Sequence, residues 1–163
     1  MTISSADCSF RIHHAHLTQR GYYPHDLNKA NQDAFCSHPV FNGEENVGLW
    51  GVFDGHGGCG DLVSTFTKQA IPRHCIGAMK KVGPPSAKFI DASEEQIMKI
   101  HHKAFVATNK ESGKQNFDTD LSGTTAITVM VKNNMMFVNN VGDSRAVVAV
   151  RTGKGELKAE HLR

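Results

Sequence analysis

The sequence has no apolar stretch long enough to cross a bilayer, and its first residues lack the charged and apolar regions of a secretory signal. The formal net charge of the 163 residues is only +2, and no basic run or stripe is present. Proteins that bind nucleic acid or an acidic membrane surface usually carry such a patch. We therefore expect a soluble intracellular protein, cytoplasmic or nuclear, that needs neither nucleic acid nor a membrane as a partner.

Cysteine is scarce as well, and its four occurrences show no C-x-x-C spacing: Cys8, Cys36, Cys59 and Cys75. This distribution fits free thiols in a reducing compartment better than a disulfide framework or a zinc knuckle. No internal repeat or low-complexity segment is visible, and an apolar content of 39% allows one substantial core. We therefore expect residues 1–163 to form one domain or most of one.

Apolar patterning predicts strands in both halves of the chain and two helices between them. Strands are expected over residues 8–17, 34–40, 49–53, 126–131, 135–138 and 146–150. Apolar residues recur at helical spacing after Gly58, and Ser93 with Gln96 forms a capping box that opens a second helix. On that helix we interpret His101 and His102 as surface residues. The order predicts an α+β fold, with helices on one face of an antiparallel sheet.

The most informative segment covers residues 52–58, where an apolar strand leads into Asp54-Gly55-His56-Gly57-Gly58. Glycines let the backbone turn tightly and approach a ligand closely. Asp54 offers a hard anionic ligand, Gly55 a carbonyl oxygen, and His56 a side chain that titrates near neutral pH. The alternative is a polar loop in which Asp54 caps the following helix. The segment alone leaves both interpretations open.

Two further polar clusters lie at strand ends, Asn31-Gln32-Asp33 and Gly142-Asp143-Ser144-Arg145. If these strands pair, the acids of the three clusters converge, and convergent acids without a cationic cluster require a divalent cation. Oxygen-only ligands indicate magnesium or manganese rather than zinc. Two such ions bridged by Asp54 would activate a water for in-line attack on a phosphoryl group, and His56 would protonate the leaving oxygen.

Three histidines near the amino terminus, His13, His14 and His16, form another group of metal-ligand type. On one strand His14 would face away from the other two, and no second ligand cluster follows. A metal site here is therefore the less favoured interpretation, and we expect ordinary strand histidines.

Four segments in register resemble successive motifs of the type 2C metal-dependent serine/threonine protein phosphatases. They are Asn-Gln-Asp-Ala-Phe at 31–35, Val-Phe-Asp-Gly-His-Gly-Gly at 52–58, Ser-Gly-Thr-Thr-Ala at 122–126 and Val-Gly-Asp-Ser-Arg-Ala at 141–146. Residues 20–24, Arg-Gly-Tyr-Tyr-Pro, also resemble the approach to the first motif in plant and protist members. One such motif would be weak support, whereas four in order are specific.

The resemblance implies a four-layer fold, in which an antiparallel β-sandwich flanked by helices holds a binuclear magnesium or manganese centre at one end. Carried over by position, Asp54 bridges the two metals, the Gly55 carbonyl coordinates one, and Asp143 serves a further, weaker metal position. Asp33 supports metal-bound water, and His56 is the general acid. The implied substrates are phosphoserine and phosphothreonine in proteins, and the complete domain is expected to be a monomer.

The sequence departs from the family pattern at two positions. Gln32 stands where an acid commonly precedes the first-motif aspartate, and the arginine that often binds substrate phosphate has no clear equivalent. Lys29 is the candidate that replaces this arginine, as a point charge. We interpret Ser122, Gly123 and Thr124 as packing residues at a strand start.

Members of the family continue for about as many residues again, and that part carries two more metal-binding aspartates. We therefore expect residues 1–163 to be the amino-terminal half of a phosphatase domain, incomplete on its carboxy-terminal side, with weak metal binding and impaired turnover. The alternative is a phosphatase-like binding or regulatory module without turnover. The four residues Asp33, Asp54, His56 and Asp143 together favour descent from an active enzyme.

Overall fold

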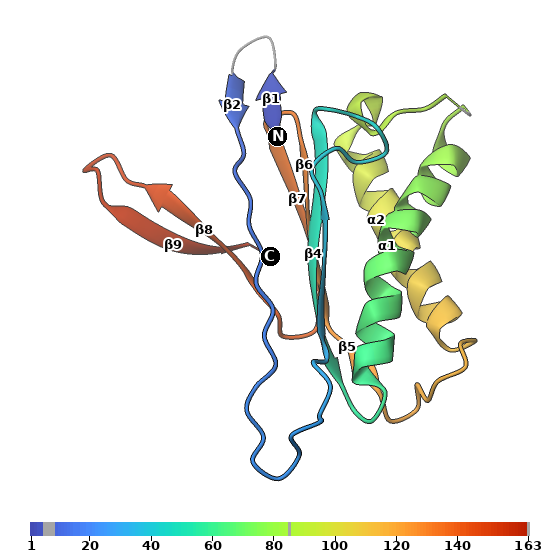
Figure 1. Ribbon diagram of the computed structural model, residues 1–163. Helices are drawn as coiled ribbons and strands as arrows, with labels where there is room; N and C mark the ends of the chain where they lie inside the picture. Colours follow the sequence, from blue (N-terminus) through green and yellow to red (C-terminus); the bar gives the residue numbers. More distant parts are fainter. Residues whose placement is uncertain (5–8, 85, 163) are drawn as a thin grey trace.

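The computed structural model of the chain describes residues 1–4, 9–84 and 86–162. Its centre is one antiparallel sheet with the strand order β3-β4-β6-β7, in which β5 also pairs with β4 (Figure 1). The strands are Asp33–His38 (β3), Val47–His56 (β4), Gly123–Thr124 (β5), Ala126–Lys132 (β6) and Met135–Val141 (β7). The two central strands, β4 and β6, are the most apolar of these, because one face of each lies in the core.

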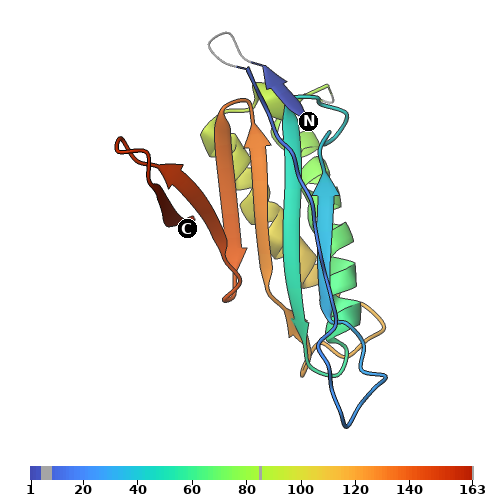
Figure 2. The ribbon, with the colours of Figure 1, turned by 60° about the vertical axis from the view of Figure 1, so that its left-hand side comes forward.

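Two helices, α1 (Gly60–Val82) and α2 (Glu94–Ser112), cover one face of this sheet (Figure 2). A short 3-10 helix, η1 (Phe89–Asp91), connects them. The expected capping box opens α2: the Gln96 amide donates to Ser93 Oγ at 3.2 Å, and the Ser93 amide donates to Gln96 Oε1 at 2.8 Å. The core lies between the helices and the sheet, and its fully buried members include Leu49, Phe53, Ile97 and Met130.

The opposite face of the sheet carries two small ribbons and a coil segment. β1 (Thr2–Ser4) pairs with β2 (Ser9–Arg11), and β8 (Ala146–Arg151) pairs with β9 (Leu157–Leu162). In the described part of the chain neither ribbon is hydrogen-bonded into the central sheet. The coil after β2 runs across this face (Figure 2). The ring centroids of His16 and Phe35 lie 3.8 Å apart, and those of His14 and Trp50 lie 5.8 Å apart.

The predicted fold class is confirmed, since antiparallel sheets and two helices on one face of the central sheet are all present. Several strand boundaries differ from the sequence-based expectation, and the differences at the ends of β2 and β4 matter most for the site. β2 ends at Arg11 instead of continuing to Leu17, and β4 extends through Asp54 to His56 because its end pairs with β5. Neither described helix combines the length and the apolar character that a membrane span requires.

The prediction that His101 is a surface residue is wrong. Its side chain is fully buried, because residues 97, 101, 104 and 108 share the α2 face turned toward the core. Its Nδ1 lies 2.9 Å from the carbonyl oxygen of Ile97, and burial lowers the pKa of the imidazole. The neighbouring His102 is exposed, as predicted.

The cysteines that the structure describes are free thiols: Cys36, Cys59 and Cys75. The fourth, Cys8, lies outside the described residues. Burial raises the pKa of Cys36 to about 11 and that of Cys75 to about 12, so both thiols stay protonated and unreactive at neutral pH.

Candidate active site

Asp33 and Asp54 are direct cross-strand partners at the end of the β3–β4 hairpin. Partners across a ladder point to the same face of a sheet, and side chains alternate along each strand. Because the neighbouring Phe53 points into the core, Asp54 and its partner lie on the face opposite to the helices. The structure therefore brings these two of the predicted site residues together.

The electrostatics of this pair favour a bound cation. Desolvation, the charge of Asp54 and a hydrogen bond between the two carboxyl groups raise the pKa of Asp33 above its usual value. Two carboxylates this close disfavour full ionisation unless a positive charge lies between them. Their oxygen donors match the preference of hard divalent cations, so the residues present fit a magnesium or manganese site.

The acid pair lines a small cavity of about 110 Å³ that also contains Gly55 and two cationic residues, Arg20 and Lys29. Arg20 Nη1 donates hydrogen bonds to the carbonyl of Leu27 and, at 3.0 Å, to that of Lys29. These bonds close the loop of residues 20–29 beside the acids. Lys29 Nζ lies 4.0 Å from the centroid of the Tyr23 ring, a cation–π arrangement.

Arg20 is thus a candidate functional residue that the sequence analysis missed. Arg20 lies far from Asp33 along the chain, and the hydrogen bonds that fold residues 20–29 back beside the acids are not visible in the sequence. The available signal was its place in the Arg-Gly-Tyr-Tyr-Pro segment, which resembles the approach to the first motif.

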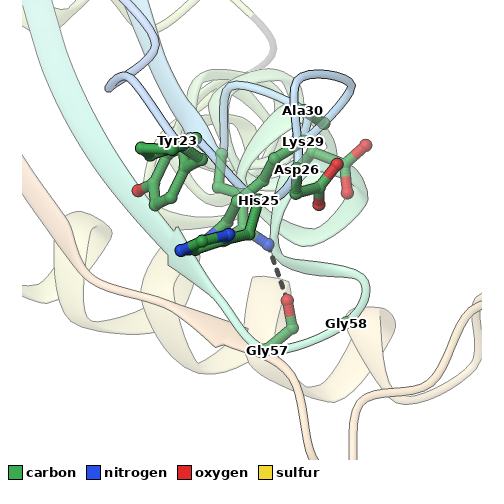
Figure 3. Close-up of a pocket in the computed structure, with 10 residues that line it drawn as sticks. Tyr23, His25, Asp26, Lys29, Ala30, Gly57 and Gly58 are labelled. Carbon is green, nitrogen blue, oxygen red and sulfur yellow. Dashed lines mark hydrogen bonds between the residues drawn. The ribbon is translucent and has the colours of Figure 1, made fainter.

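Gln32 holds the segment before β3 against the glycine loop. Its Nε2 donates to the Gly57 carbonyl at 2.6 Å, the bond drawn dashed in Figure 3. Its own carbonyl accepts from the Gly55 amide at 3.1 Å and from Ser64 Oγ at 2.6 Å. Gly57 has a φ of 85°, and a Cβ there would overlap the backbone of residues 121 and 122, so the loop requires glycine. The residue that departs from the family pattern therefore has a structural role.

A second cavity, of about 500 Å³, adjoins the first and shares Tyr23, Lys29, Ala30 and Gln32 with it. In Figure 3 the loop side chains of this cavity lie across from Gly57 and Gly58. The acid pair therefore stands at one end of a longer concave surface formed by the 20–30 loop and the glycine loop.

His56 ends β4 and is the cross-strand partner of Gly123 in β5. A Cβ at position 123 would lie 2.8 Å from His56 Nε2, so the imidazole occupies the space that the missing side chain leaves. The adjacent Ser122 Oγ accepts a hydrogen bond from the Cys59 amide at 2.9 Å and joins this segment to the start of α1. Gly123, which the sequence analysis treated as packing, therefore positions His56.

Thr125 connects Asp54 to the turn that carries Asp143. The Asp54 amide donates to Thr125 Oγ1 at 3.1 Å, the Thr125 amide donates to the Asp54 carbonyl at 2.9 Å, and Thr125 Oγ1 lies 2.6 Å from Ser144 Oγ. Asp143 is therefore at the same end of the sheet. Among the described residues, however, no three His, Cys, Asp or Glu side chains gather as a metal cluster, so a metal role for Asp143 stays a prediction.

The structure rules out the alternative in which Asp54 caps the following helix. Asp54 lies within β4, and α1 begins at Gly60 with Cys59 as its N-cap. In the described part of the chain no side chain forms a capping hydrogen bond there. The acid is thus available to a ligand.

Comparison with known proteins agrees with the motifs. A sequence model of the family "Protein phosphatase 2C" matches residues 25–162, and the chain belongs to this family. A protein of Arabidopsis thaliana, "Probable protein phosphatase 2C 35", is 38% identical over 154 residues, which cover 94% of this chain and 40% of that protein. The chain therefore spans less than half the length of the curated relatives that it matches.

Solved structures share the fold. A serine-threonine phosphatase 2C from Toxoplasma gondii superposes with a TM-score of 0.68 at 22% identity, over 83% of this chain and 46% of that one. The phosphatase MsPP from Mycobacterium smegmatis gives a TM-score of 0.52 at 21% identity, over 90% of this chain and 50% of that one. At this level of identity the likeness supports the fold.

Proposed function

We propose that this chain carries part of a metal-dependent phosphatase that hydrolyses phosphoserine and phosphothreonine in proteins. The observation that carries the proposal is the Asp33–Asp54 pair, which shares one cavity with the cations of Arg20 and Lys29. Hydrolysis of a phosphate monoester needs oxygen ligands for metal ions and positive charge for the phosphate oxygens. This cavity combines both kinds of group.

Asp54 and the Gly55 carbonyl would hold the cations, Asp33 would hold metal-bound water, and Asp143 would serve a further, weaker position. The donors are oxygens, so we propose two Mg²⁺ or Mn²⁺ ions. When bound, such ions supply charge neutralisation and lower the pKa of water, which makes it a nucleophile. The raised pKa of Asp33 supports this assignment, because a nearby cation stabilises its ionised form.

The remaining residues bind the phosphate and move a proton. Lys29 contributes a point charge to the phosphate oxygens, and Arg20 uses Nη1 to hold the loop while its other N–H groups remain for the phosphate. His56 lines a separate cavity on the helix side of the sheet and not the acid-pair cavity, so its ring would turn toward the substrate to protonate the oxygen of serine or threonine as it leaves. The larger cavity beside Gly57 and Gly58 takes the peptide that flanks the phosphorylated residue.

The chain covers only part of the length of its relatives, which bears on the activity of residues 1–163 alone. Because the chain spans about 40% of its Arabidopsis relative, we propose that turnover by residues 1–163 alone is impaired and that further ligands complete the centre. We place the protein inside the cell, in the cytoplasm or nucleus, as a monomer acting on phosphorylated proteins. A second candidate function is a phosphatase-like binding module without turnover, which is favoured by the gathering of only two acids among the described residues.

The experiment compares this chain with an extended chain, in which the sequence that follows the matched region in the Arabidopsis relative is joined to it. Both are assayed on a phosphothreonine peptide with Mn²⁺ and with a chelator. We expect metal-dependent turnover by the extended chain, loss of that turnover in Asp54→Asn, and little turnover by the 163-residue chain. Full activity of Asp54→Asn would remove the site assignment, and an inactive extended chain that still binds the phosphopeptide would favour the binding module.

The acid role of His56 has a separate test. His56→Ala should slow the hydrolysis of an alkyl phosphate, such as phosphothreonine, more than that of an aryl phosphate, because an aryl oxide leaves without protonation. Equal losses on the two substrates would contradict the role. His102→Ala, which changes an exposed histidine on α2, is the matched control.

A further inference from the structure

A large cavity lies on the helix side of the sheet, behind the candidate active site. Its volume is about 810 Å³, within the range of cavities that bind small organic molecules. The first half of α1, the second half of α2, β5 and the segment that leads into β5 form its walls. In Figure 1 these elements meet at the lower end of the sheet, where β4 also ends.

The chemistry of the walls selects against cationic ligands. Among the described residues that line the cavity there is no Asp, Glu, Lys or Arg, and the only titratable side chains are His56 and His102. Val63 and Phe105 contribute apolar surface from the two helices. A cationic group transferred from water to such a site loses hydration without gaining an anionic partner, whereas a neutral apolar body loses little.

One wall residue also offers an unused hydrogen-bonding group. Thr108 on α2 lines the cavity and is 4% exposed, and its Oγ1 has no hydrogen-bond partner among the described residues. A buried hydroxyl without a partner costs free energy, and most such groups in folded proteins are satisfied. A ligand that carries one hydroxyl on an apolar body would satisfy it, with rotation about the Thr108 Cα–Cβ bond bringing Oγ1 into reach.

We propose that this cavity is a binding site for a neutral amphipathic small molecule, with an aromatic or aliphatic body and a single hydroxyl group that pairs with Thr108. The site is distinct from the acid pair, which lies on the opposite face of the sheet. It nevertheless contacts the active-site end of β4, because His56 and its partner Gly123 are both wall residues. An occupant therefore touches the residue that positions the proposed acid.

The test uses 2-naphthol as the probe and 2-naphthyltrimethylammonium as its cationic analogue, with the 163-residue chain labelled for NMR. We expect 2-naphthol to shift the amide resonances of Thr108, Ser122 and Gly123 and the ring signals of His56 in a saturable manner. The cationic analogue should bind at least about tenfold more weakly, because the described lining residues offer no carboxylate to its charge.

Thr108→Val keeps the side-chain shape and removes the hydroxyl, so it should weaken 2-naphthol binding about tenfold, the effect of one neutral hydrogen bond. Thr128→Val is the matched control. Thr128 is also fully buried, its hydroxyl likewise has no partner in the described part of the chain, and it does not line the cavity. Unchanged affinity in Thr108→Val, equal loss in Thr128→Val, or equal binding of the cationic analogue would overturn the proposal. Spectra that retain the wild-type dispersion show that both variants are folded.

Discussion

The imidazole of His56 lies against the α-carbon of Gly123, so the proposed acid takes its position from a residue on the neighbouring strand. A Cβ at position 123 would come within 2.8 Å of Nε2, which is closer than real Cβ contacts allow. The ring would have to turn away.

Gly123→Ala should therefore lower the turnover of phosphothreonine peptide by the extended chain by roughly tenfold to a hundredfold, the cost of a misplaced catalytic group. Gly77→Ala is the control, because a Cβ there meets open space. The two variants are compared by initial rates at saturating Mn²⁺. A Gly123→Ala protein with unaltered rates would show that the ring position is not what limits proton transfer.

Asp33→Asn should stabilise the metal-free chain at neutral pH. The pKa of Asp33 is raised in the folded chain, so its ionisation costs stability as the pH rises above the ordinary value of 3.8 and through the folded-state pKa. The variant lacks this loss, and in a chelator its melting temperature should exceed that of the wild type at pH 7 but match it at low pH.

Added Mn²⁺ should reverse that order, because the wild type gains binding energy that Asp33→Asn loses. Asp120→Asn, at an exposed position, controls for the change in net charge. A variant that is less stable than the wild type in chelator at pH 7 would contradict the repulsion between Asp33 and Asp54.

His101 should make the chain sensitive to mild acid. Burial lowers the pKa of its imidazole. Below pH 6.5, the ordinary pKa, the unfolded chain therefore takes up a proton that the folded chain does not, and the free energy of unfolding decreases as the pH is lowered. One such group contributes at most about 1.4 kcal/mol per pH unit. Urea unfolding is measured for wild type and His101→Phe between about pH 7.5 and about pH 5.0, on both sides of the ordinary pKa. The free energy of unfolding should depend less steeply on pH in the variant. His102→Phe should keep the wild-type dependence, because that side chain is exposed.

Glu44 should stabilise the connection between the two helices. Its carboxylate accepts hydrogen bonds from the Phe89 amide at 2.9 Å and the Ile90 amide at 2.8 Å, at the start of η1. Glu44→Ala leaves these amides without their partner and should lower the free energy of unfolding by about 1–3 kcal/mol. Glu45→Ala, at the adjacent exposed position, should change it by less than about 0.5 kcal/mol in the same denaturant titration.

Local chemistry explains which features were predictable from the sequence. The capping box at Ser93 and the glycine loop after Asp54 both follow from neighbouring residues, and the motifs placed Asp33 and Asp54 at strand ends. Contacts between distant segments explain the failures. β4 continues to His56 only because β5, far along the chain, pairs with it, and Arg20 reaches the acid pair through a long loop.

His101 shows a different limit. Two adjacent histidines on a helix differ by about 100° in direction, so a small error in the phase of the apolar face exchanges the buried one for the exposed one. The packing of α1 against α2 determines that phase, and no local pattern reports it. The contact between Gly123 and His56 could not be predicted either. It depends on the pairing of β5 with β4, and a glycine at a strand start has many other uses.

The pairing of Asp33 with Asp54 also depends on the number of residues in the connection between β3 and β4. The ladder that ends in this pair begins at His38 and Leu49, and the connection between them turns at Asn42 and Gly43, whose φ values are 56° and 78°. Because successive side chains alternate between the faces of a strand, a slip of one residue would send one acid into the core and leave the other outside. Insertions or deletions of a single residue between positions 39 and 46 should therefore be tolerated poorly by the chemistry at the far end of the sheet. The number of residues in this distant connection is therefore as much a requirement of the proposed metal site as the acids themselves.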